Sequence, residues 1–405
     1  MQFIDLKAQL NRIESQVVAR FKAVLNHGAY IMGPEVAELE QALSKFVGVE
    51  HSLLVASGTD ALLIALMALD IGAGDEVITT PFSFFATAEV IALLGAKPVF
   101  VDIDKETYNI DPNRIEAAIS TRTKAIMPVS LYGQCADFDE INALAAKYGL
   151  PVIEDAAQSF GASYKNKKSC GITTIGCTSF FPSKPLGCYG DGGACFTNDH
   201  ELASKMNEIR THGQSRRYYH TRLGINGRLD TIQAAILLEK MAIFPEEIQL
   251  RQQVADRYQQ MLPKEIRKPF IKNHNVSVYA QYTVEVTHRE KVQQALQKRG
   301  IPTAVHYPVG LHEQPIFKKL YPEEQKFSFT ENAAQRVMSL PMHPYLTSEE
   351  QQKICTALQE ILSEESLNVN NYSLVGLEMT SDKYTQKNSN VSKPKKQPQP
   401  AEKAT

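Results

Sequence analysis

The chain has 405 residues, of which 43% are hydrophobic and 22% are charged, and its formal net charge is −2. This length suits one large domain and a smaller one, and the composition is that of an ordinary globular protein. The nearly neutral charge gives no electrostatic reason to expect nucleic acid or an anionic membrane as a partner, and no apolar run is long enough to span a bilayer.

The N-terminus and the cysteines indicate a cytoplasmic protein. Residues 1–7 lack the basic start and apolar core of a signal peptide. The six cysteines contain no C-x-x-C pair, and most lie in apolar or glycine-rich surroundings, as is typical of reduced thiols. Ten histidines occur without an H-E-x-x-H motif or a Cys/His cluster, so no metal site is expected.

The first part of the chain predicts two helices and then a parallel sheet. Apolar residues recur at helical spacing over 6–26, and a second helix runs to about Phe46. Strands then alternate with helices, which is typical of a mainly parallel sheet with helices on both faces. The expected strands are 52–56, 75–80, 97–103, 124–130 and 151–155, and the helices are 62–69, 85–94, 112–119 and 138–148.

Two more strands, 177–181 and 194–197, and a helix, 201–210, complete a large domain over 1–245. The polar, glycine-punctuated stretch 214–230 is long enough for a functional or interfacial loop. A helical region, 231–261, is expected to be interrupted at Pro245 and to lead out of this domain.

The remainder predicts a small α/β domain over 246–365, followed by a tail. Its expected elements are strands 276–286 and 303–307 and helices 289–299 and 348–362. Residues 366–405 are dominated by Asn, Ser, Lys, Gln and Pro, with too little apolar content for a core, so we expect them to be disordered.

Lys184 is the first candidate for chemistry. It sits in a short loop between two apolar strands, among glycines and a proline, with no acid within six residues of it in the sequence. A lysine confined in a pocket has a lowered pKa, and its free amine can attack a carbonyl. The alternative is a surface lysine in a glycine-rich turn.

Asp155 strengthens this interpretation. It ends the buried strand 151–155, and ligands of α/β sheets bind at the carboxyl ends of the strands. An Asp there, followed by a lone loop lysine, suits pyridoxal 5'-phosphate: the Asp keeps the pyridine nitrogen protonated and Lys184 forms the Schiff base. The alternative for Asp155 is a helix N-cap.

Two further features fit a phosphorylated, flat cofactor. Residues 57–61 place small and polar side chains at the start of a helix, where backbone N–H groups and the helix dipole favour a phosphate. A plain helix cap without a ligand is the alternative. Phe82, Phe84 and Phe85 cluster at a strand-to-helix turn, where one ring can stack on a cofactor or simply belong to the core.

These residues lie in motifs that resemble the DegT/DnrJ/EryC1/StrS family of pyridoxal-phosphate-dependent sugar aminotransferases. The resemblance extends from Phe3 to about Leu362. It implies fold type I, the aspartate-aminotransferase-like α/β fold, with a mainly parallel seven-stranded sheet and a small C-terminal α/β domain. The motifs are Gly33–Val36, Ser57–Leu62, Gly74–Ile78, Gly95–Asp102, Tyr132–Gln134, Ile153–Ser159, Ser179–Lys184, Gly190–Gly193 and His306–Pro308.

The resemblance also implies roles for individual residues. Lys184 forms the Schiff base and then moves the proton, while Asp155 pairs with the ring nitrogen. Gln158 lies near the ring hydroxyl and Phe84 stacks on the ring. The phosphate is held by Gly58, Thr59 and Ser179, together with Asn226 of a neighbouring subunit, so a homodimer is expected.

Within the family, three segments are similar to enzymes that aminate UDP-2-acetamido-2-deoxy-3-oxo-D-glucuronate with L-glutamate, for bacterial polysaccharide such as O-antigen. They are Ser130–Asp139, Phe180–Gly193 and Val278–Thr283, and they include Asp191 where many relatives carry Glu. Both substrates carry a carboxylate, for which Arg228 of the partner is our candidate, the alternative being an ion pair with Asp230. His306, Tyr307 and His212 are further candidate substrate contacts.

Three other interpretations compete with this one, and the residues present argue against the last two. A 4-keto-6-deoxy sugar nucleotide aminotransferase would use the same machinery and differ in the sugar pocket. A 3-dehydrase of the family would carry His in place of Lys184. A non-catalytic regulatory member need not keep Lys184, Asp155, Gln158 and Asn226 together.

Overall fold

The computed structural model describes the backbone of residues 1–378 and the side chains of residues 1–364. Met1–Gln359 form one compact unit, and the described residues from Glu360 onward belong to a second one. The expected division of the first unit at residue 245, into a large and a small domain, stays a prediction. None of the described helices is long and apolar enough to cross a membrane.

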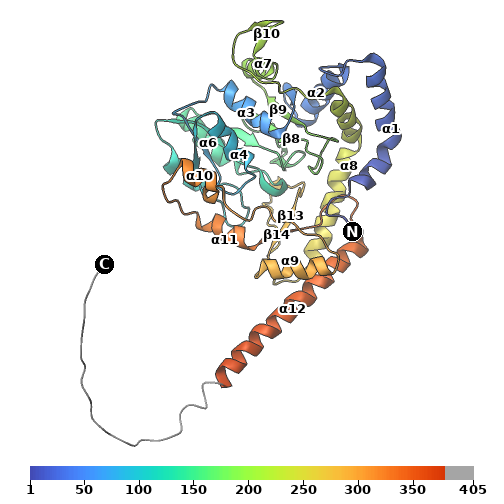
Figure 1. The fold of residues 1–405 in the computed structure, drawn as a ribbon, viewed down its shortest axis with the longest axis vertical. Helices are drawn as coiled ribbons and strands as arrows, with labels where there is room; N and C mark the ends of the chain where they lie inside the picture. The colour runs from blue at the N-terminus through green and yellow to red at the C-terminus, as the bar shows by residue number, and fades with distance from the viewer. Residues whose placement is uncertain (379–405) are drawn as a thin grey trace, which may run out of the picture. The chain divides into compact units, whose positions relative to one another are not determined.

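A mainly parallel sheet occupies the centre of the compact unit (Figure 1), as predicted. One part has the order β1-β9-β8-β5 and the other the order β3-β2-β4. Bridges between Ile126 and Val152 and between Val129 and Asp155 join the two parts, and in the whole sheet β9 runs against its neighbours. The strands are β1 (His51–Val55), β2 (Glu76–Thr79), β3 (Lys97–Phe100), β4 (Thr123–Met127), β5 (Ile153–Asp155), β8 (Ile175–Ser179) and β9 (Gly193–Thr197).

Alternating side chains of the strands bury both faces of this sheet. Leu53 and Val55 of β1 pack on one face, and Leu54 between them packs on the other. The first face is covered by α3 (Gly58–Ala68), α4 (Ala86–Leu93) and α7 (His200–Ile209). The opposite face is covered by α2 (Pro34–Val47), α6 (Phe138–Tyr148) and α8 (Thr231–Met261).

Helix α8 differs from its prediction because it continues through Pro245 without interruption. A proline inside a helix removes one backbone hydrogen bond. The helix tolerates this loss because it packs along α1 (Leu6–His27) and α2.

Gly28 ends α1 in the left-handed conformation, at φ 69°, which glycine adopts without strain.

The polar stretch after α7 is partly ordered into a hairpin rather than being a plain loop. Strands β10 (Gln214–Arg216) and β11 (Tyr219–His220) pair in antiparallel fashion. The Arg216 guanidinium lies 4.6 Å from the centroid of the Tyr219 ring, a cation–π contact that links the two strands.

The expected strand 276–286 is wrong, because its two ends pair with different partners. Strand β12 (Asn275–Val276) pairs with β6 (Ser163–Tyr164), which also pairs with β7 (Lys167–Lys168). Strand β13 (Tyr282–Glu285) pairs with β14 (Val337–Leu340). Between them Tyr279 has a φ of 45°, which bends the chain away from a continuous strand.

The expected strand 303–307 is also wrong. It is reduced to one bridge between Ala304 and Ser339. Pro302 and Pro308 flank the segment, and a proline cannot donate a ladder hydrogen bond.

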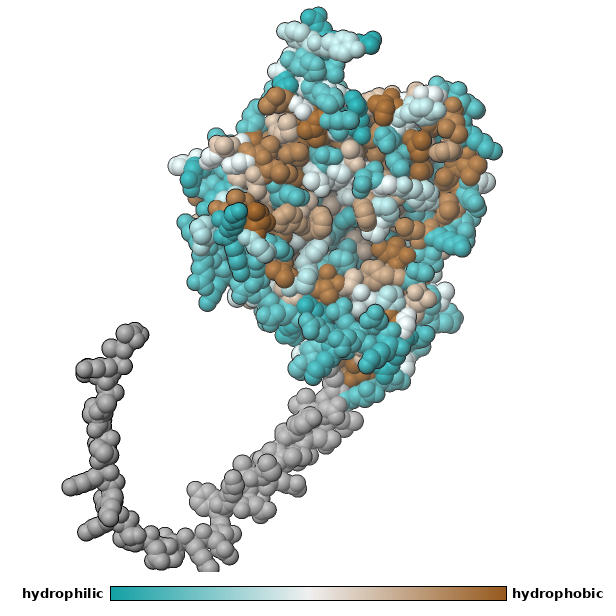
Figure 2. All heavy atoms as spheres, viewed as in Figure 1, coloured by the Kyte–Doolittle hydropathy of each residue, from teal (hydrophilic) through white to brown (hydrophobic). Residues whose placement is uncertain are grey.

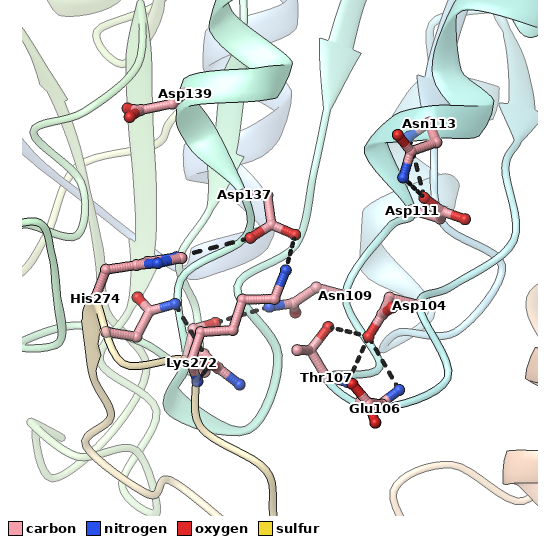
Figure 3. A network of polar contacts seen from close by, with 12 residues as sticks. Asp104, Glu106, Thr107, Asn109, Asp111, Asn113, Asp137, Asp139, Lys272 and His274 are labelled. Atoms are coloured by element: carbon pink, nitrogen blue, oxygen red, sulfur yellow. Dashed lines mark hydrogen bonds and ion pairs between the residues drawn. The ribbon is translucent and has the colours of Figure 1, made fainter.

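Figure 3 shows how the segment before β12 is held against the body of the protein. The Lys272 Nζ donates to Asp137 Oδ2 at 2.7 Å, and His274 Nε2 lies 3.9 Å from the other oxygen of Asp137. The Lys272 backbone N–H also donates to Gln134 Oε1 at 2.8 Å. These contacts fix the chain just before it reaches the candidate site.

The remaining helices and short turns are α5 (Pro112–Ile115), η1 (Glu116–Ala118), η2 (Leu131–Gly133), α9 (Arg289–Lys298), η3 (Leu311–Glu313), α10 (Pro315–Leu320), α11 (Ser328–Arg336) and α12 (Ser348–Glu378). Helix α12 extends beyond the expected end at Leu362 and into the segment 366–405 that we expected to be disordered. The rest of that segment, 379–405, lies outside the described residues.

Candidate active site

A cavity of about 460 Å³ lies at the carboxyl ends of β5 and β8. Parallel strands that end together bring side chains from distant parts of the chain into one place. In the pairing of these two strands Asp155 is opposite Cys177, so the loop that follows β8 starts beside Asp155. Of the residues predicted from the sequence, the cavity is lined by Gly58, Thr59, Phe84, Asp155, Gln158, Ser179, Lys184, His306 and Tyr307.

Lys184 reaches the cavity from the loop after β8. Its backbone N–H donates to Phe181 O at 2.9 Å, which closes a tight turn. Burial lowers the pKa of the Lys184 amine, and the Asp155 carboxylate opposes this shift. Burial therefore increases the fraction of neutral, nucleophilic amine, as the sequence interpretation required.

Asp155 is buried and fixed by two hydrogen bonds. Thr87 Oγ1 donates to one carboxylate oxygen at 2.8 Å, and the Ala157 N–H donates to the other at 3.1 Å. Burial raises the pKa of Asp155, whereas these two bonds and the nearby Lys184 lower it. Ser83 Oγ, 2.8 Å from Thr87 Oγ1, extends the chain of hydroxyl groups that orients the carboxylate.

The start of α3 forms a narrow cradle beside Ser179. Ser57 caps the helix, accepting from the Asp60 N–H at 3.0 Å. A Cβ atom on Gly58 would lie 2.5 Å from Ser179 Cβ, and one on Gly193 would lie 2.4 Å from Ser57 O. Only glycine fits at these two positions, because any side chain would collide with the neighbouring segment. Without side chains there, the first N–H groups of the helix stay accessible to an anion.

The opposite wall is made by aromatic and amide side chains. Gln158 accepts from the Tyr132 N–H at 2.9 Å and donates to the Tyr307 hydroxyl at 3.0 Å. The Phe84 ring is 57% exposed, and its centroid lies 6.3 Å from that of Tyr307. Burial raises the pKa of Tyr307, so its hydroxyl stays protonated. Since Gln158 is the donor in their hydrogen bond, the hydroxyl proton is not used in it.

His306 is held as a neutral ring in the same wall. Its Nδ1 lies 2.9 Å from Ser339 Oγ, and its backbone carbonyl accepts from the Tyr132 hydroxyl. Burial, with a smaller contribution from Lys184, lowers the pKa of His306 from 6.5 to about 4. The ring therefore contributes no positive charge near pH 7.

Several residues of this site were given no role from the sequence. Thr87 and Ser339 act through contacts between segments far apart in the chain, which no local pattern reveals, and Tyr132 lies in one of the family motifs but its bond to Gln158 was not predicted. Gln281 lines the cavity, and its buried Oε1 has no hydrogen-bond partner among the described residues.

The residues of the cavity fit pyridoxal phosphate. An amine with a lowered pKa, an oriented carboxylate and an open helix N-terminus are the three groups that this cofactor needs. Lys184 would attach it, Asp155 would face its ring nitrogen, and Gly58, Thr59 and Ser179 would receive its phosphate. In the described part of the chain no group of three His, Cys, Asp or Glu residues is arranged to hold a metal ion.

Three predicted residues do not line this cavity within the part of the chain that the structure describes. Asn226 is exposed and pairs with Thr211, and Arg228 is half-buried and pairs with Val55. The Arg228 Nε is buried without a hydrogen-bond partner among these residues. His212 is exposed, and its carbonyl lies 2.8 Å from His220 Nδ1. Their roles stay predictions.

The lowered pKa of His306 predicts an acid-dependent loss of stability. As pH falls from 6.5 to about 4, the unfolded chain binds a proton at this residue before the folded chain does, so folding weakens over this window. In cofactor-free protein, His306→Gln should reduce the loss of unfolding free energy between pH 7 and pH 4 by about 2 kcal/mol, allowing for partial exposure. Urea titrations measure this, with the exposed His220→Gln as control; an unchanged acid loss in His306→Gln contradicts it.

Comparison with known proteins agrees with this geometry. The model of the DegT/DnrJ/EryC1/StrS aminotransferase family matches residues 11–359. UDP-2-acetamido-2-deoxy-3-oxo-D-glucuronate aminotransferase of Pseudomonas aeruginosa is 61% identical over 359 residues, covering 88% of this chain and 99% of that protein.

Solved structures share the fold. A DegT DnrJ EryC1 StrS aminotransferase from Brucella abortus has a TM-score of 0.87 at 45% identity, covering 89% of this chain and 99% of that one. A Bacillus subtilis protein with the bound cofactor PMP has a TM-score of 0.82 at 31% identity, covering 89% and 83%. These matches confirm the resemblance and the fold expected from the motifs. The chain belongs to the DegT/DnrJ/EryC1/StrS aminotransferase family.

Proposed function

We propose that this enzyme transfers an amino group from L-glutamate to UDP-2-acetamido-2-deoxy-3-oxo-D-glucuronate. The products are the 3-amino sugar nucleotide and 2-oxoglutarate. The observation that carries the proposal is the convergence of Lys184 and the oriented Asp155 in one cavity, in a chain 61% identical to the Pseudomonas aeruginosa enzyme of that name. The keto carbon gains the amino group that glutamate loses, so the exchange needs no external oxidant or reductant.

Pyridoxal phosphate, when bound, supplies the electron sink for this exchange. Lys184 would attach the cofactor, and its amine, whose pKa burial lowers, would carry the proton to and from the reacting carbon. Asp155, oriented by Thr87 and Ala157, would hold the ring nitrogen as a hydrogen-bonded carboxylate. Its burial strengthens its attraction to a positively charged partner, because water screens the pair less.

The lining of the cavity supports a contribution from a second subunit. Glutamate and the uronate sugar both carry a carboxylate, which needs a cation to pair with it. Among the described residues that line the cavity, Lys184 is the one cation, and its amine is committed to chemistry. Its charged neighbours, Asp155 and Asp191, are acids, and His306 is neutral.

Arg228 of a partner subunit is the proposed carboxylate-binding residue. Its Nε has no hydrogen-bond partner within its own described chain, and a guanidinium pairs with a carboxylate through two parallel hydrogen bonds. Asn226, which is exposed and lies two residues before Arg228, is proposed to reach the partner's cofactor phosphate. His212, at the base of this segment, is retained as a candidate contact to the partner's substrate.

A homodimer also suits the surface. Large apolar side chains are exposed beside the cavity, including Phe84 at 57% and Phe181 at 51%. Others are exposed on α1 and the segment that follows it, where Figure 2 shows apolar patches among polar residues. Burial of such side chains stabilises association by roughly 25 cal/mol per Å² of apolar area before the costs of binding.

His306, Tyr307 and Gln281 are the proposed contacts to the sugar nucleotide. All three residues line the same cavity. The Tyr307 hydroxyl proton is not used in its bond with Gln158, and the Gln281 Oε1 has no hydrogen-bond partner among the described residues. The six buried free thiols suit the cytoplasm, where nucleotide sugars for bacterial polysaccharide such as O-antigen would be used.

A two-stage spectroscopic assay tests the function. Mixing the purified, pyridoxal-phosphate-loaded enzyme with L-glutamate should convert the cofactor to its amino form, with one 2-oxoglutarate released per site. Adding the 3-keto uronate should then restore the original spectrum, while UDP- or dTDP-linked 4-keto-6-deoxy sugars should not. Restoration by a 4-keto sugar alone would replace the proposed substrate, and no conversion by glutamate would contradict the donor.

The role of Lys184 predicts a complete loss of turnover. Lys184→Ala should retain pyridoxal phosphate non-covalently through the α3 cradle and Asp155, but lose at least about 10⁴-fold in kcat, since it removes both the attachment and the proton carrier. Borohydride reduction and peptide mass spectrometry measure the attachment. Lys205→Ala, on α7 and outside the cavity lining, should behave like wild type; steady transamination by Lys184→Ala would refute the assignment.

The proposed role of Arg228 predicts that its removal selectively weakens the binding of the carboxylate substrates. Arg228→Ala should raise KM for the 3-keto uronate and glutamate by about 10- to 100-fold, the range expected for a lost charge-assisted pair of about 1.5–3 kcal/mol. Sedimentation should show the dimer unchanged, and Arg216→Ala, on the exposed β10–β11 hairpin, serves as the matched control. A variant that binds both substrates normally would remove Arg228 from the site.

A further inference from the structure

Lys240 is a lysine with no exposed surface, in the first half of helix α8. Its Nζ donates to the Gly187 carbonyl at 2.5 Å and lies 4.1 Å from the centroid of the Tyr189 ring. Among the described residues no carboxylate lies within ion-pair distance of it. Burial lowers the pKa of Lys240 to about 8, against the opposing effects of Glu247 and Cys188.

This burial is unfavourable for stability. Removing an ammonium from water is costly, and one carbonyl and one ring face offset only part of this cost. A methionine of similar length would fill the same space without a charge, and such replacements of buried ions are often neutral or stabilising. The stability of the fold therefore does not explain why a lysine occupies this position, and its two contacts need another explanation.

Both contacts of Lys240 fall on the loop that carries Lys184. A Cβ atom on Gly187 would lie 2.6 Å from Phe181 O and 2.5 Å from Pro182 O, so the loop folds back tightly on itself. The same Phe181 carbonyl accepts the Lys184 N–H at 2.9 Å. Gly187 and Lys184 thus belong to one compact turn, and a displacement of one moves the other.

Helix α8 holds the far end of this loop by a second side chain. Gln233 accepts from the Tyr189 N–H at 2.9 Å and donates to the Tyr189 carbonyl at 3.2 Å. These bonds fix Tyr189, and the buried Leu186 packs in the core cluster to which α8 contributes. Among the described residues, the bond from Lys240 to Gly187 is the hydrogen bond that joins α8 to the turn between Phe181 and Gly187.

We propose that Lys240 is a positioning residue whose ammonium group holds the Gly187 carbonyl and thereby fixes the turn that places Lys184 for proton transfer. This rests on the proposed function, in which Lys184 moves the proton. Lys240 lies outside the cavity lining and touches neither substrate nor cofactor. It acts on kcat through the geometry of Lys184, for which a displacement of about 1 Å costs on the order of 100-fold.

Lys168 offers a matched control, because it makes the same two kinds of contact away from the site. Its Nζ donates to the Gly161 carbonyl at 3.3 Å and lies 5.2 Å from the centroid of the Phe46 ring. Burial lowers its pKa as well. Lys168→Met therefore reports what the loss of such a lysine does to the fold alone.

The test compares Lys240→Met with Lys168→Met in the pyridoxal-phosphate-loaded enzyme. Lys240→Met should lower kcat by about 10- to 100-fold with KM for glutamate unchanged within about twofold. Its peptide spanning 181–190 should exchange amide hydrogens faster than in wild type, while Lys168→Met matches wild type in kcat and in this exchange. Wild-type kcat and exchange in Lys240→Met, or a change in KM alone, overturns the proposal.

Two provisions keep the test decisive. If Lys240→Met does not fold, Lys240→Gln removes the ammonium that holds the Gly187 carbonyl but keeps a polar side chain, and the proposal requires the same fall in kcat and faster exchange. The exchange measurement needs no sugar substrate. A wild-type enzyme that rejects the 3-keto uronate would therefore refute the proposed substrate while leaving the exchange result to decide the role of Lys240.

Discussion

The burial of Asp155 and Lys184 in one cavity is the constraint on which the rest of the site depends. Burial raises the pKa of the acid and lowers that of the amine, and each group partly offsets the shift of the other. Asp155 is 5% exposed and Lys184 is partly buried, so the carboxylate in particular needs partners at this depth. The parallel pairing of β5 and β8 brings the two together, and the Thr87 hydroxyl and the Ala157 N–H supply the hydrogen bonds that the carboxylate would otherwise lack.

The surroundings of this pair are rigid where chemistry needs precision. The glycines at 58 and 193 let β8, β9 and the start of α3 approach more closely than any side chain allows. On the other side of the loop, Gln233 and Lys240 attach α8 to Tyr189 and Gly187. The loop that carries Lys184 is therefore held from both faces of the sheet, by packing on one and by polar contacts on the other.

The sequence predicted what depends on local pattern and on motifs. Alternating strands and helices indicated the parallel sheet, and the motifs around Asp155 and Lys184 indicated the cavity, because strand ends meet at one edge. It failed where distant contacts decide. No residue near Thr87 or Lys240 in the sequence indicates their hydrogen-bond partners. The segment 276–286 is not one strand, because its two ends pair with different strands. Pro245 remains inside α8, because α1 and α2 pack along this helix.

The scarcity of positive charge in the cavity lining connects the proposed dimer with the choice of substrate. A site whose single lining cation is its reactive amine cannot bind carboxylate substrates strongly without weakening that amine as a base, because a paired ammonium has a raised pKa. Supplying the carboxylate partner from outside the chain separates the two tasks. In the proposed dimer, the segment with Asn226 and Arg228 would make substrate choice a property of the dimer, while the Lys184 loop, held within each chain, would make proton transfer a property of the subunit.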